Sequence, residues 1–142
     1  MGHVAGSELD GRTIPHDASL EGLVSKKKDF IGKRSLSRSA FTKPDREKIV
    51  GLVPLDKTTS IPEGSYIVKD PKAKLPNPKL GHVSASCWSV EYDNPFSLAI
   101  IKDGKNMIGQ KLFAMSPLKN KTIPVEIVSS HYVDPEGKRV RA

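Results

Sequence analysis

Short runs of alternating apolar and polar residues, separated by turn residues, dominate the chain from residue 48 onward. Alternation with a period of two puts the apolar side chains on one face of a strand, and Gly, Pro, Asn and Asp between such runs favour turns. An Asp-Gly pair at 103–104 ends one of these runs with a turn signal. The pattern predicts six strands, at residues 48–56, 65–70, 80–92, 94–105, 108–116 and 121–133.

The beginning of the chain has a different pattern. Residues 1–28 are polar and rich in turn residues, and they contain no element that forms a core by itself. Phe30 and Leu36 fall near helical spacing, and Asp29 before them is a candidate N-cap. This stretch therefore predicts a short helix at about residues 31–40.

Six short strands with such turns predict an all-β fold, a six-stranded antiparallel Greek-key barrel preceded by an extended arm and one short helix. The length of 142 residues is suited to one domain with an extra arm. Apolar residues make up 37% of the chain and aromatic residues 6%, so the core is expected to be small and aliphatic.

The charge and the single cysteine narrow the classes of partner and compartment. A net charge of +7 permits a polyanionic partner, such as nucleic acid, a phosphate or a polyglutamate tail. Cys87 is alone, which excludes an internal disulfide, and the histidines form no i,i+4 pair, so no metal site is expected. A reducing cytosol is the expected compartment, and no apolar run approaches the length of about 18 residues that spans a bilayer. Cys87 itself is predicted to be a small buried hydrophobe.

The segment VSKKKDFIGKRSL, residues 24–36, is strongly basic. Single-stranded nucleic acid binding requires aromatic residues interleaved with the cations, as platforms on which the bases stack. Phe30 and Phe41 are the aromatic residues nearby, and their spacing suits packing under a helix. We therefore expect no nucleic-acid partner, and a small basic RNA-binding barrel is kept as an alternative.

Several stretches of the sequence, taken in order, resemble the aminomethyltransferase (glycine-cleavage T-protein) family. DGRTIPHDASLEGLVSKKKDFIGKRSL resembles the family's stretch from a Thr-x-Pro turn to a helix start, and REKIVGLVPLD resembles its first barrel strand. PEGSYIV, GHVSASCWS, SLAIIKDG and IGQKLFA match later strands in the same order. The resemblance covers residues 10–142. It implies that residues 1–44 are the end of a folate-binding domain and residues 45–142 the family's C-terminal barrel domain.

Within this family, VSKKKDFIGKRSL and VDPEGKRVR most resemble the C-terminal part of sarcosine oxidase alpha subunits. The resemblance implies a place in cytoplasmic one-carbon metabolism, in an oxidoreductase that acts on the CH–NH group of its donor. The implied reaction demethylates sarcosine to glycine oxidatively and transfers the one-carbon unit to tetrahydrofolate. The implied cofactor of this part is tetrahydrofolate, whereas FAD, FMN and NAD are bound elsewhere in the assembly.

The same resemblance implies partners. They are the other sarcosine oxidase subunits, the N-terminal part of the same polypeptide, and folate, with neither nucleic acid nor a membrane. A fragment of a T-protein-like aminomethyltransferase, working with a lipoyl protein, is the alternative within the family.

Four residues are the predicted folate-binding residues: Asp17, Lys26, Lys27 and Lys28. The lysines follow from the family's basic residue near the glutamate carboxylates of folate, and Asp17 from an acidic residue close to the folate site. No catalytic residue is carried over, because the family's assisting carboxylate lies upstream of this segment. The segment alone is therefore expected to be inactive. Trp88 and Tyr92 are expected to form a contact surface toward other domains.

Overall fold

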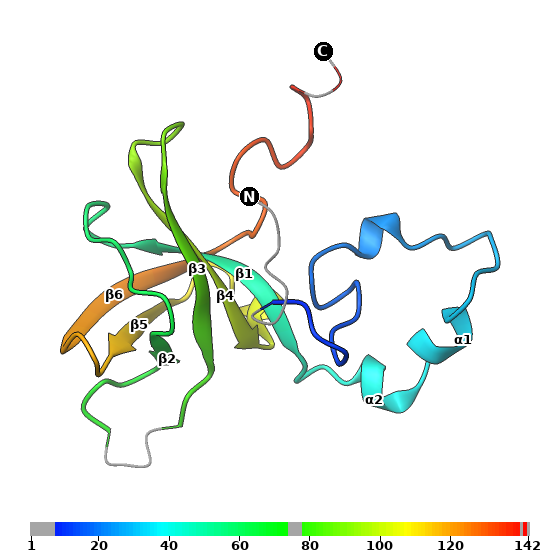
Figure 1. Ribbon diagram of the computed structural model, residues 1–142, viewed down its shortest axis with the longest axis horizontal. Coiled ribbons are helices and arrows are strands. Elements are labelled where there is room, and N and C mark those ends of the chain that lie inside the picture. The colour runs from blue at the N-terminus through cyan, green and yellow to red at the C-terminus, as the bar shows by residue number, and fades with distance from the viewer. Residues whose placement is uncertain (1–7, 74–77, 140, 142) are drawn as a thin grey trace.

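The computed structural model describes residues 8–73, 78–139 and 141. Residues 1–7 of the predicted arm lie outside the described residues. Figure 1 shows a β-barrel from which the arm projects on one side, while the C-terminal segment leaves the barrel in a different direction. No helix in the described part of the chain is long and apolar enough to cross a bilayer.

Six antiparallel strands close into a barrel in the order β1-β4-β3-β2-β5-β6. Their bounds are Glu47–Pro54 (β1), Tyr66–Val68 (β2), Gly81–Ser89 (β3), Asn94–Lys102 (β4), Lys111–Ser116 (β5) and Lys121–Val128 (β6). β2, β3 and β4 are consecutive neighbours, and β1 lies beside β4, which is a Greek-key arrangement. The predicted all-β class and the six-stranded antiparallel barrel are confirmed. The observed strands are shorter than most of the predicted ranges, and β1 starts one residue earlier.

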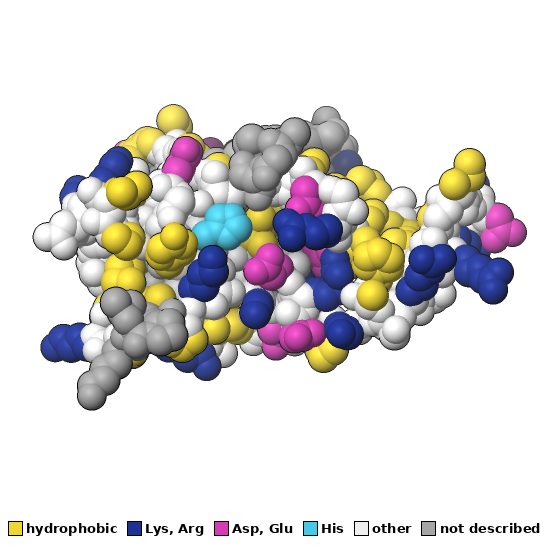
Figure 2. Space-filling view, turned by 60° about the horizontal axis from the view of Figure 1, so that its bottom comes forward, with side chains coloured by type: hydrophobic (Ala, Val, Ile, Leu, Met, Phe, Trp, Pro, Cys, Tyr) yellow, Lys and Arg dark blue, Asp and Glu magenta, His cyan; other side chains and the backbone are white. Residues whose placement is uncertain are grey.

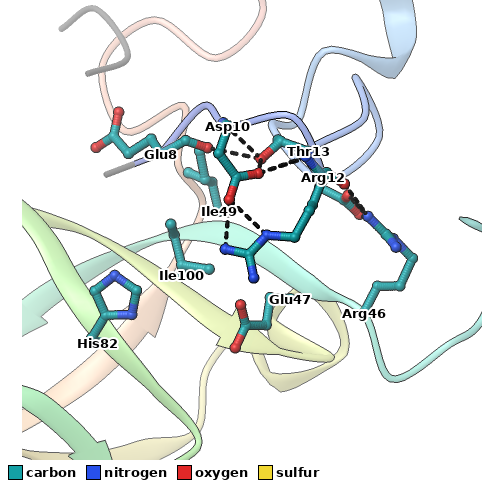
Figure 3. A pocket seen from close by; sticks show the side chains of 10 residues that line it. Glu8, Asp10, Arg12, Thr13, Arg46, Glu47, Ile49, His82 and Ile100 are labelled. Atoms are coloured by element: carbon teal, nitrogen blue, oxygen red, sulfur yellow. Dashed lines mark hydrogen bonds and ion pairs between the residues drawn. The ribbon is translucent and has the colours of Figure 1, made fainter. Parts of the chain in front are cut away.

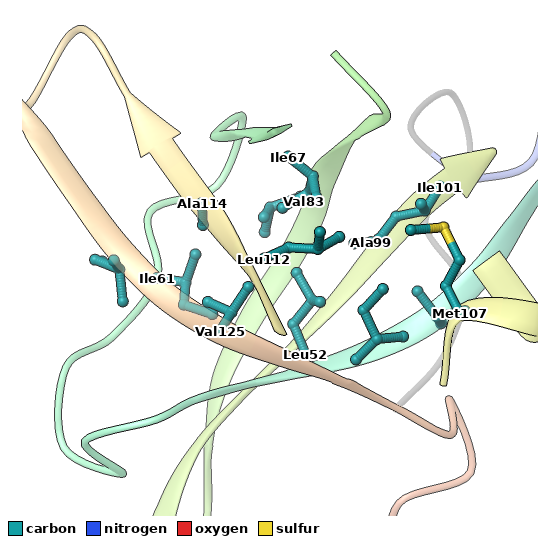
Figure 4. Packing of buried hydrophobic residues seen from close by; sticks show 13 residues of the cluster. Leu52, Ile61, Ile67, Val83, Ala99, Ile101, Met107, Leu112, Ala114 and Val125 are labelled. Atoms are coloured by element: carbon teal, nitrogen blue, oxygen red, sulfur yellow. The ribbon is translucent and has the colours of Figure 1, made fainter. Parts of the chain in front are cut away.

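The barrel interior follows the period-two pattern of the sequence. In β6, the side chains of Ile123, Val125 and Ile127 are buried, and the residues between them are exposed or half-buried. They meet Leu52 of β1 and Leu112 of β5 inside the barrel (Figure 4). The whole cluster is aliphatic apart from one methionine, and it comprises Val50, Leu52, Ile61, Ile67, Val83, Ala99, Ile101, Met107, Leu112, Ala114, Ile123, Val125 and Ile127.

A second apolar cluster covers the outer face of β1 and β4. It contains Ile49, Val53, Phe96 and Leu98 from the two strands, together with Ala18 from the arm. The backbone N–H of Ile49 donates to the carbonyl oxygen of Asp17 at 2.8 Å, which ties the same part of the arm to β1. This contact places the side chain of Asp17 beside the barrel wall.

The predicted helix at about residues 31–40 is wrong in its extent. Two separate helical turns, α1 (Lys33–Leu36) and α2 (Ser39–Thr42), occur instead, after a 3₁₀ turn η1 (Glu21–Leu23). Gly32, with φ 95°, is the N-cap of α1 in place of Asp29, whose carboxylate pairs with Lys33 at 3.0 Å. Helices this short gain little from their own hydrogen bonds, and no residue of α1 or α2 is buried. Without a surface to pack on, the apolar spacing does not sustain a continuous helix.

β3 and β4 continue past the barrel wall as a hairpin (Figure 1). The register between them shifts between Val83 and Ala85, and beyond this bulge β3 pairs with β4 alone. Cys87 lies in this part of β3 and is exposed, so the prediction of a buried cysteine is wrong. The predicted turn at 103–104 is confirmed, because Asp103 has φ 53° and leads into a 3₁₀ turn, η2 (Gly104–Met107).

Candidate functional site

A polar cleft of about 350 Å³ lies between the arm and the outer face of the barrel (Figure 3). Figure 2 shows acidic and basic side chains intermixed over the middle of the molecule, with further Lys and Arg side chains at the end that carries the arm. β1, β3 and β4 form the barrel side of the cleft. The lining residues are Glu8, Asp10, Arg12, Thr13, Asp17, Arg46, Glu47, Ile49, His82 and Ile100.

Asp10 and Arg12 form an ion pair on the arm side of this cleft. Arg12 Nε and Nη2 donate to Asp10 Oδ2 at 2.8 and 2.6 Å, and the backbone N–H of Arg12 donates to Asp10 Oδ1 at 2.8 Å. These hydrogen bonds lower the pKa of Asp10 from 3.8 to about 2. A carboxylate with so low a pKa is a weak proton acceptor at neutral pH, so Asp10 orders the loop and is unsuited to general-base chemistry.

Arg46 and Asp17 form a second ion pair at the junction of arm and barrel. Arg46 Nε donates to Asp17 Oδ1 at 3.0 Å, and Arg46 Nη2 donates to Asp17 Oδ2. The backbone N–H of Ile14 also donates to Asp17 Oδ2, at 3.2 Å. The hydrogen bond and charge of Asp17 raise the pKa of Arg46 above its ordinary value. The carboxylate is therefore held by a fork of donors, which is the strong geometry for such a pair.

Glu8 also links the arm to the barrel. Its side chain is buried, and Ser84 Oγ of β3 donates to Glu8 Oε1 at 2.7 Å. Across residues 8–73, 78–139 and 141, no group of three or more His, Cys, Asp or Glu side chains is arranged to hold a metal ion. The carboxylates of Glu8 and Asp17 join distant segments of the chain, whereas that of Asp10 orders a turn within the arm. The expected absence of catalytic residues stays a prediction.

The predicted folate-binding lysines lie away from this cleft. Lys26, Lys27 and Lys28 are exposed on the arm, and the backbone N–H of Lys28 donates to Ser25 Oγ at 2.9 Å. Lys28 lines an apolar groove of about 420 Å³ that the arm forms with its own side chains, Pro15, Leu20, Leu23, Val24, Phe30 and Leu36 among them. Asp17 lines the polar cleft, so the four predicted residues do not share one cavity. Their role in folate binding stays a prediction.

A third groove, of about 600 Å³, lies between the β3–β4 hairpin and the C-terminal segment. The ring of Tyr132 stacks on Phe96, with centroids 4.6 Å apart and planes at 12°, and Tyr92 packs on it at a tilt. Trp88 of β3 is 51% exposed, and Tyr92 is 47% exposed. Exposed aromatic residues are frequent in protein interfaces, and the contact surface expected of these two residues stays a prediction.

Arg46 was not among the predicted site residues, although its side chain contacts Arg12, Asp17 and Ala40. A signal was available, because Arg46 is the first residue of REKIVGLVPLD, directly before the first predicted strand. Its partners Arg12 and Asp17 are distant along the chain, and no local periodicity connects them to it. Lys105, which pairs with Glu21 of the arm, was missed for the same reason.

The chain belongs to the glycine cleavage T-protein C-terminal barrel domain family, because the model of that family matches residues 47–134. The match falls on the closed barrel and on the segment that follows it.

Curated relatives are similar over nearly the whole chain. "Sarcosine oxidase subunit alpha" of Rhizobium meliloti (strain 1021) is 35% identical over 141 residues, which cover 98% of this chain and 14% of that protein. "Sarcosine oxidase subunit alpha" of Corynebacterium sp. (strain P-1) is 36% identical over 138 residues, 96% of this chain and 14% of that protein. The chain therefore spans about a seventh of the length of these relatives.

Two further similarities concern aminomethyltransferases. "Aminomethyltransferase" of Synechococcus sp. (strain CC9902) is 30% identical over 129 residues, which cover 89% of this chain and 32% of that protein. The solved structure of glycine cleavage system aminomethyltransferase T from Bartonella henselae superposes with a TM-score of 0.69 at 22% identity, over 91% of this chain and 34% of that one. This structural likeness shows that the arm and barrel share that protein's fold.

Proposed function

We propose that this chain is the C-terminal, folate-side module of a sarcosine oxidase alpha subunit. In this role it contributes to oxidative demethylation of sarcosine to glycine, with transfer of the one-carbon unit to tetrahydrofolate. The observation that carries the proposal is 35% identity to a sarcosine oxidase alpha subunit over 98% of this chain. The chain spans 14% of that relative, and in our proposal other parts of the assembly bind the flavins and NAD.

The arm has features that fit tetrahydrofolate. Folates join a flat heteroaromatic ring system to a tail of glutamate carboxylates, so their sites combine apolar surface with cations. The apolar groove of the arm has Lys28 in its lining, and Lys26 and Lys27 are exposed beside it in the sequence. In our proposal these lysines bind the anionic tail, and Asp17 holds the base of the segment that carries them. Bound tetrahydrofolate supplies the acceptor for the one-carbon unit.

The proposal includes the organisation of the longer polypeptide. Residues 1–44 are the end of a folate-binding domain, and residues 45–142 are the C-terminal barrel domain. Trp88 and Tyr92 contact other domains or subunits of the assembly, which works in the cytoplasm. An enclosed space between these parts keeps the one-carbon unit from hydrolysis in bulk water.

Binding of a folate to the 142-residue chain tests the proposal. The probes are the monoglutamate and triglutamate forms of 5-formyltetrahydrofolate, titrated by calorimetry. The triple variant Lys26→Ala, Lys27→Ala, Lys28→Ala is expected to bind the triglutamate about tenfold more weakly, because charge-assisted contacts to the tail are lost.

A second triple variant, with Lys57, Lys119 and Lys121 changed to Ala, removes the same charge from exposed sites on the barrel. Equal losses in both triple variants would show that bulk charge, and no site on the arm, attracts the ligand. No binding of either folate, with a salt-dependent mobility shift of single-stranded RNA, would favour the RNA-binding alternative.

A T-protein-like aminomethyltransferase is the second candidate, favoured by the 30% identity to the Synechococcus protein. The reading frame upstream of residue 1 separates the two candidates. A dinucleotide-binding half is expected for a sarcosine oxidase alpha subunit, and its absence from the complete polypeptide would favour the aminomethyltransferase.

A further inference from the structure

Arg46 precedes β1 directly and contacts both ends of the arm. Its Nη2 donates to the carbonyl oxygen of Arg12 at 2.9 Å, and its Nη1 donates to that of Ala40 at 3.1 Å. Its Nε donates to Asp17 Oδ1 at 3.0 Å, and its guanidinium lies over the ring of Phe41, 5.2 Å from the centroid. One side chain therefore joins two distant parts of the arm to the first barrel strand, and Figure 3 shows Arg46 beside the polar cleft.

The part of the arm between these contacts is not held in place by buried side chains. From residue 19 to residue 48, all of which the structure describes, no residue is buried. The near end has further links to the barrel, since Ser19 Oγ donates to the Ile49 carbonyl at 3.2 Å and Glu21 pairs with Lys105. At the far end, the side chain of Arg46 contacts Ala40 and Phe41.

The chemistry of these contacts requires an arginine. The side chains of Asp17 and Arg46 are 7% and 20% exposed, so loss of either partner leaves a charge with little solvent to replace it. A planar guanidinium presents several donors in fixed directions, and here they reach Asp17, Arg12 and Ala40 at once. A lysine ammonium keeps the charge but has a single donor atom, so it cannot reach all three.

We infer that Arg46 is a positioning residue that fixes the basic segment 24–36, and that Asp17 acts on ligand binding through Arg46. The inference rests on the proposed function, in which Lys26, Lys27 and Lys28 bind an anionic ligand. Holding both ends of a loop restricts the positions of its middle, so the cations stay where a ligand meets them. Such preorganisation strengthens binding because less freedom is lost on association.

Hydrogen–deuterium exchange on the 142-residue chain tests the positioning itself. In Arg46→Ala, amides of residues 21–42 are expected to exchange about tenfold faster, while the strands of the barrel change by less than about twofold. Arg46→Lys is expected to lie between Arg46→Ala and the wild type. The matched control is Arg139→Ala, which removes one arginine from the ion pair with Glu91 near the hairpin. Equal exchange of the arm in Arg46→Ala and Arg139→Ala would overturn the inference.

Titration of 5-formyltetrahydrofolate triglutamate tests the consequence for binding. Arg46→Ala is expected to weaken binding about tenfold, with partial rescue in Arg46→Lys and no change in Arg139→Ala. Asp17→Asn alone is expected to weaken binding of the triglutamate. In the Arg46→Ala background, the same change is expected to weaken binding by less than about a further twofold, because the two residues act as one unit. Additive losses in this double-mutant cycle would show that Asp17 contacts the ligand independently, against the inference.

Failure of the proposed function has a different signature. If the wild-type chain binds no folate, the proposed function is refuted for this chain, and the exchange experiment alone decides whether Arg46 positions the arm. If Arg46→Ala unfolds the barrel as well as the arm, the same comparison is made with Arg46→Lys. Arm exchange at the wild-type rate in Arg46→Lys, with folate binding also unchanged, would then overturn the inference.

Discussion

Among the described glycines, Gly81 is the one at which an added Cβ atom would come closest to another atom. It lies where β3 pairs with both neighbours, opposite Ile67 of β2 and Ile101 of β4. A Cβ atom on Gly81 would be 1.9 Å from the carbonyl oxygen of Ile100 and 2.8 Å from Cα of Ile101. Both are backbone atoms, so no side-chain rotation relieves the contact, and Gly81→Ala must push β4 away from β3.

The magnitude follows from this geometry. Carbon–oxygen contacts between strands are ordinarily about 3.3 Å or longer, so the two strands must separate by more than about 1 Å. Nearby, the N–H of Lys102 donates to the Leu80 carbonyl at 2.9 Å, and such a separation breaks that bond. One or two lost hydrogen bonds, at about 1 kcal/mol each, add to an overpacking cost of 1–3 kcal/mol. We expect the free energy of unfolding to fall by about 3 kcal/mol.

Urea denaturation followed by tryptophan fluorescence measures the effect. With an m-value of about 2 kcal/mol/M, the midpoint is expected to fall by about 1.5 M. Gly22→Ala is the matched control, because an added Cβ there meets no atom within 4 Å, and its effect is expected to stay within about 0.5 kcal/mol. If Gly81→Ala lowers the free energy of unfolding by less than about 1 kcal/mol, the reasoning is refuted, since β3 and β4 would then separate at Gly81 at little cost in stability.

Three further predictions concern the core, a carboxyl group and the thiol. Leu52 is fully buried, so Leu52→Ala is expected to lower the free energy of unfolding by about 3 kcal/mol, against less than about 0.5 kcal/mol for the exposed Leu118→Ala. Similar urea midpoints for these two variants would contradict the observed core. Hydrogen bonds from Arg12 lower the pKa of Asp10 from 3.8 to about 2, so the stability that Asp10 contributes is present above about pH 3.8 and is lost as the pH falls toward about 2. NMR titration is expected to find the Asp10 carboxyl near about 2 in the wild type and closer to 3.8 in Arg12→Ala, and equal values would count against the ion pair. Cys87 is exposed, so a thiol reagent is expected to label the native chain almost as fast as the urea-unfolded chain, and strong protection would contradict its position.

The strands could be predicted because each depends on a pattern within a few residues. Ile123, Val125 and Ile127 alternate with polar neighbours, and this alternation by itself puts them on one face of a strand. The same reasoning failed for the helix at 31–40, because helical spacing sustains a short helix only where its apolar face finds a surface. Ile31 has none and is fully exposed.

The candidate site was predicted less completely than the fold. The basic segment is visible in the sequence, and Lys26, Lys27 and Lys28 are exposed in the structure. The partner of Asp17 is Arg46, 29 residues away, and no periodicity or spacing connects them. The exposure of Cys87 was also beyond prediction, because it depends on where β3 leaves the barrel wall.

The sequence alone determined the all-β class, the six strands and the basic character of the arm, since alternation, turn residues and charge are local properties of the chain. Only the tertiary structure decided which strands are neighbours, how closely β3 approaches β4 at Gly81, and how Arg46 joins the arm to the barrel. These features depend on groups that are far apart in the chain and meet only when the barrel closes. Their energies come from contacts between backbone atoms and buried charges, which a linear pattern does not encode.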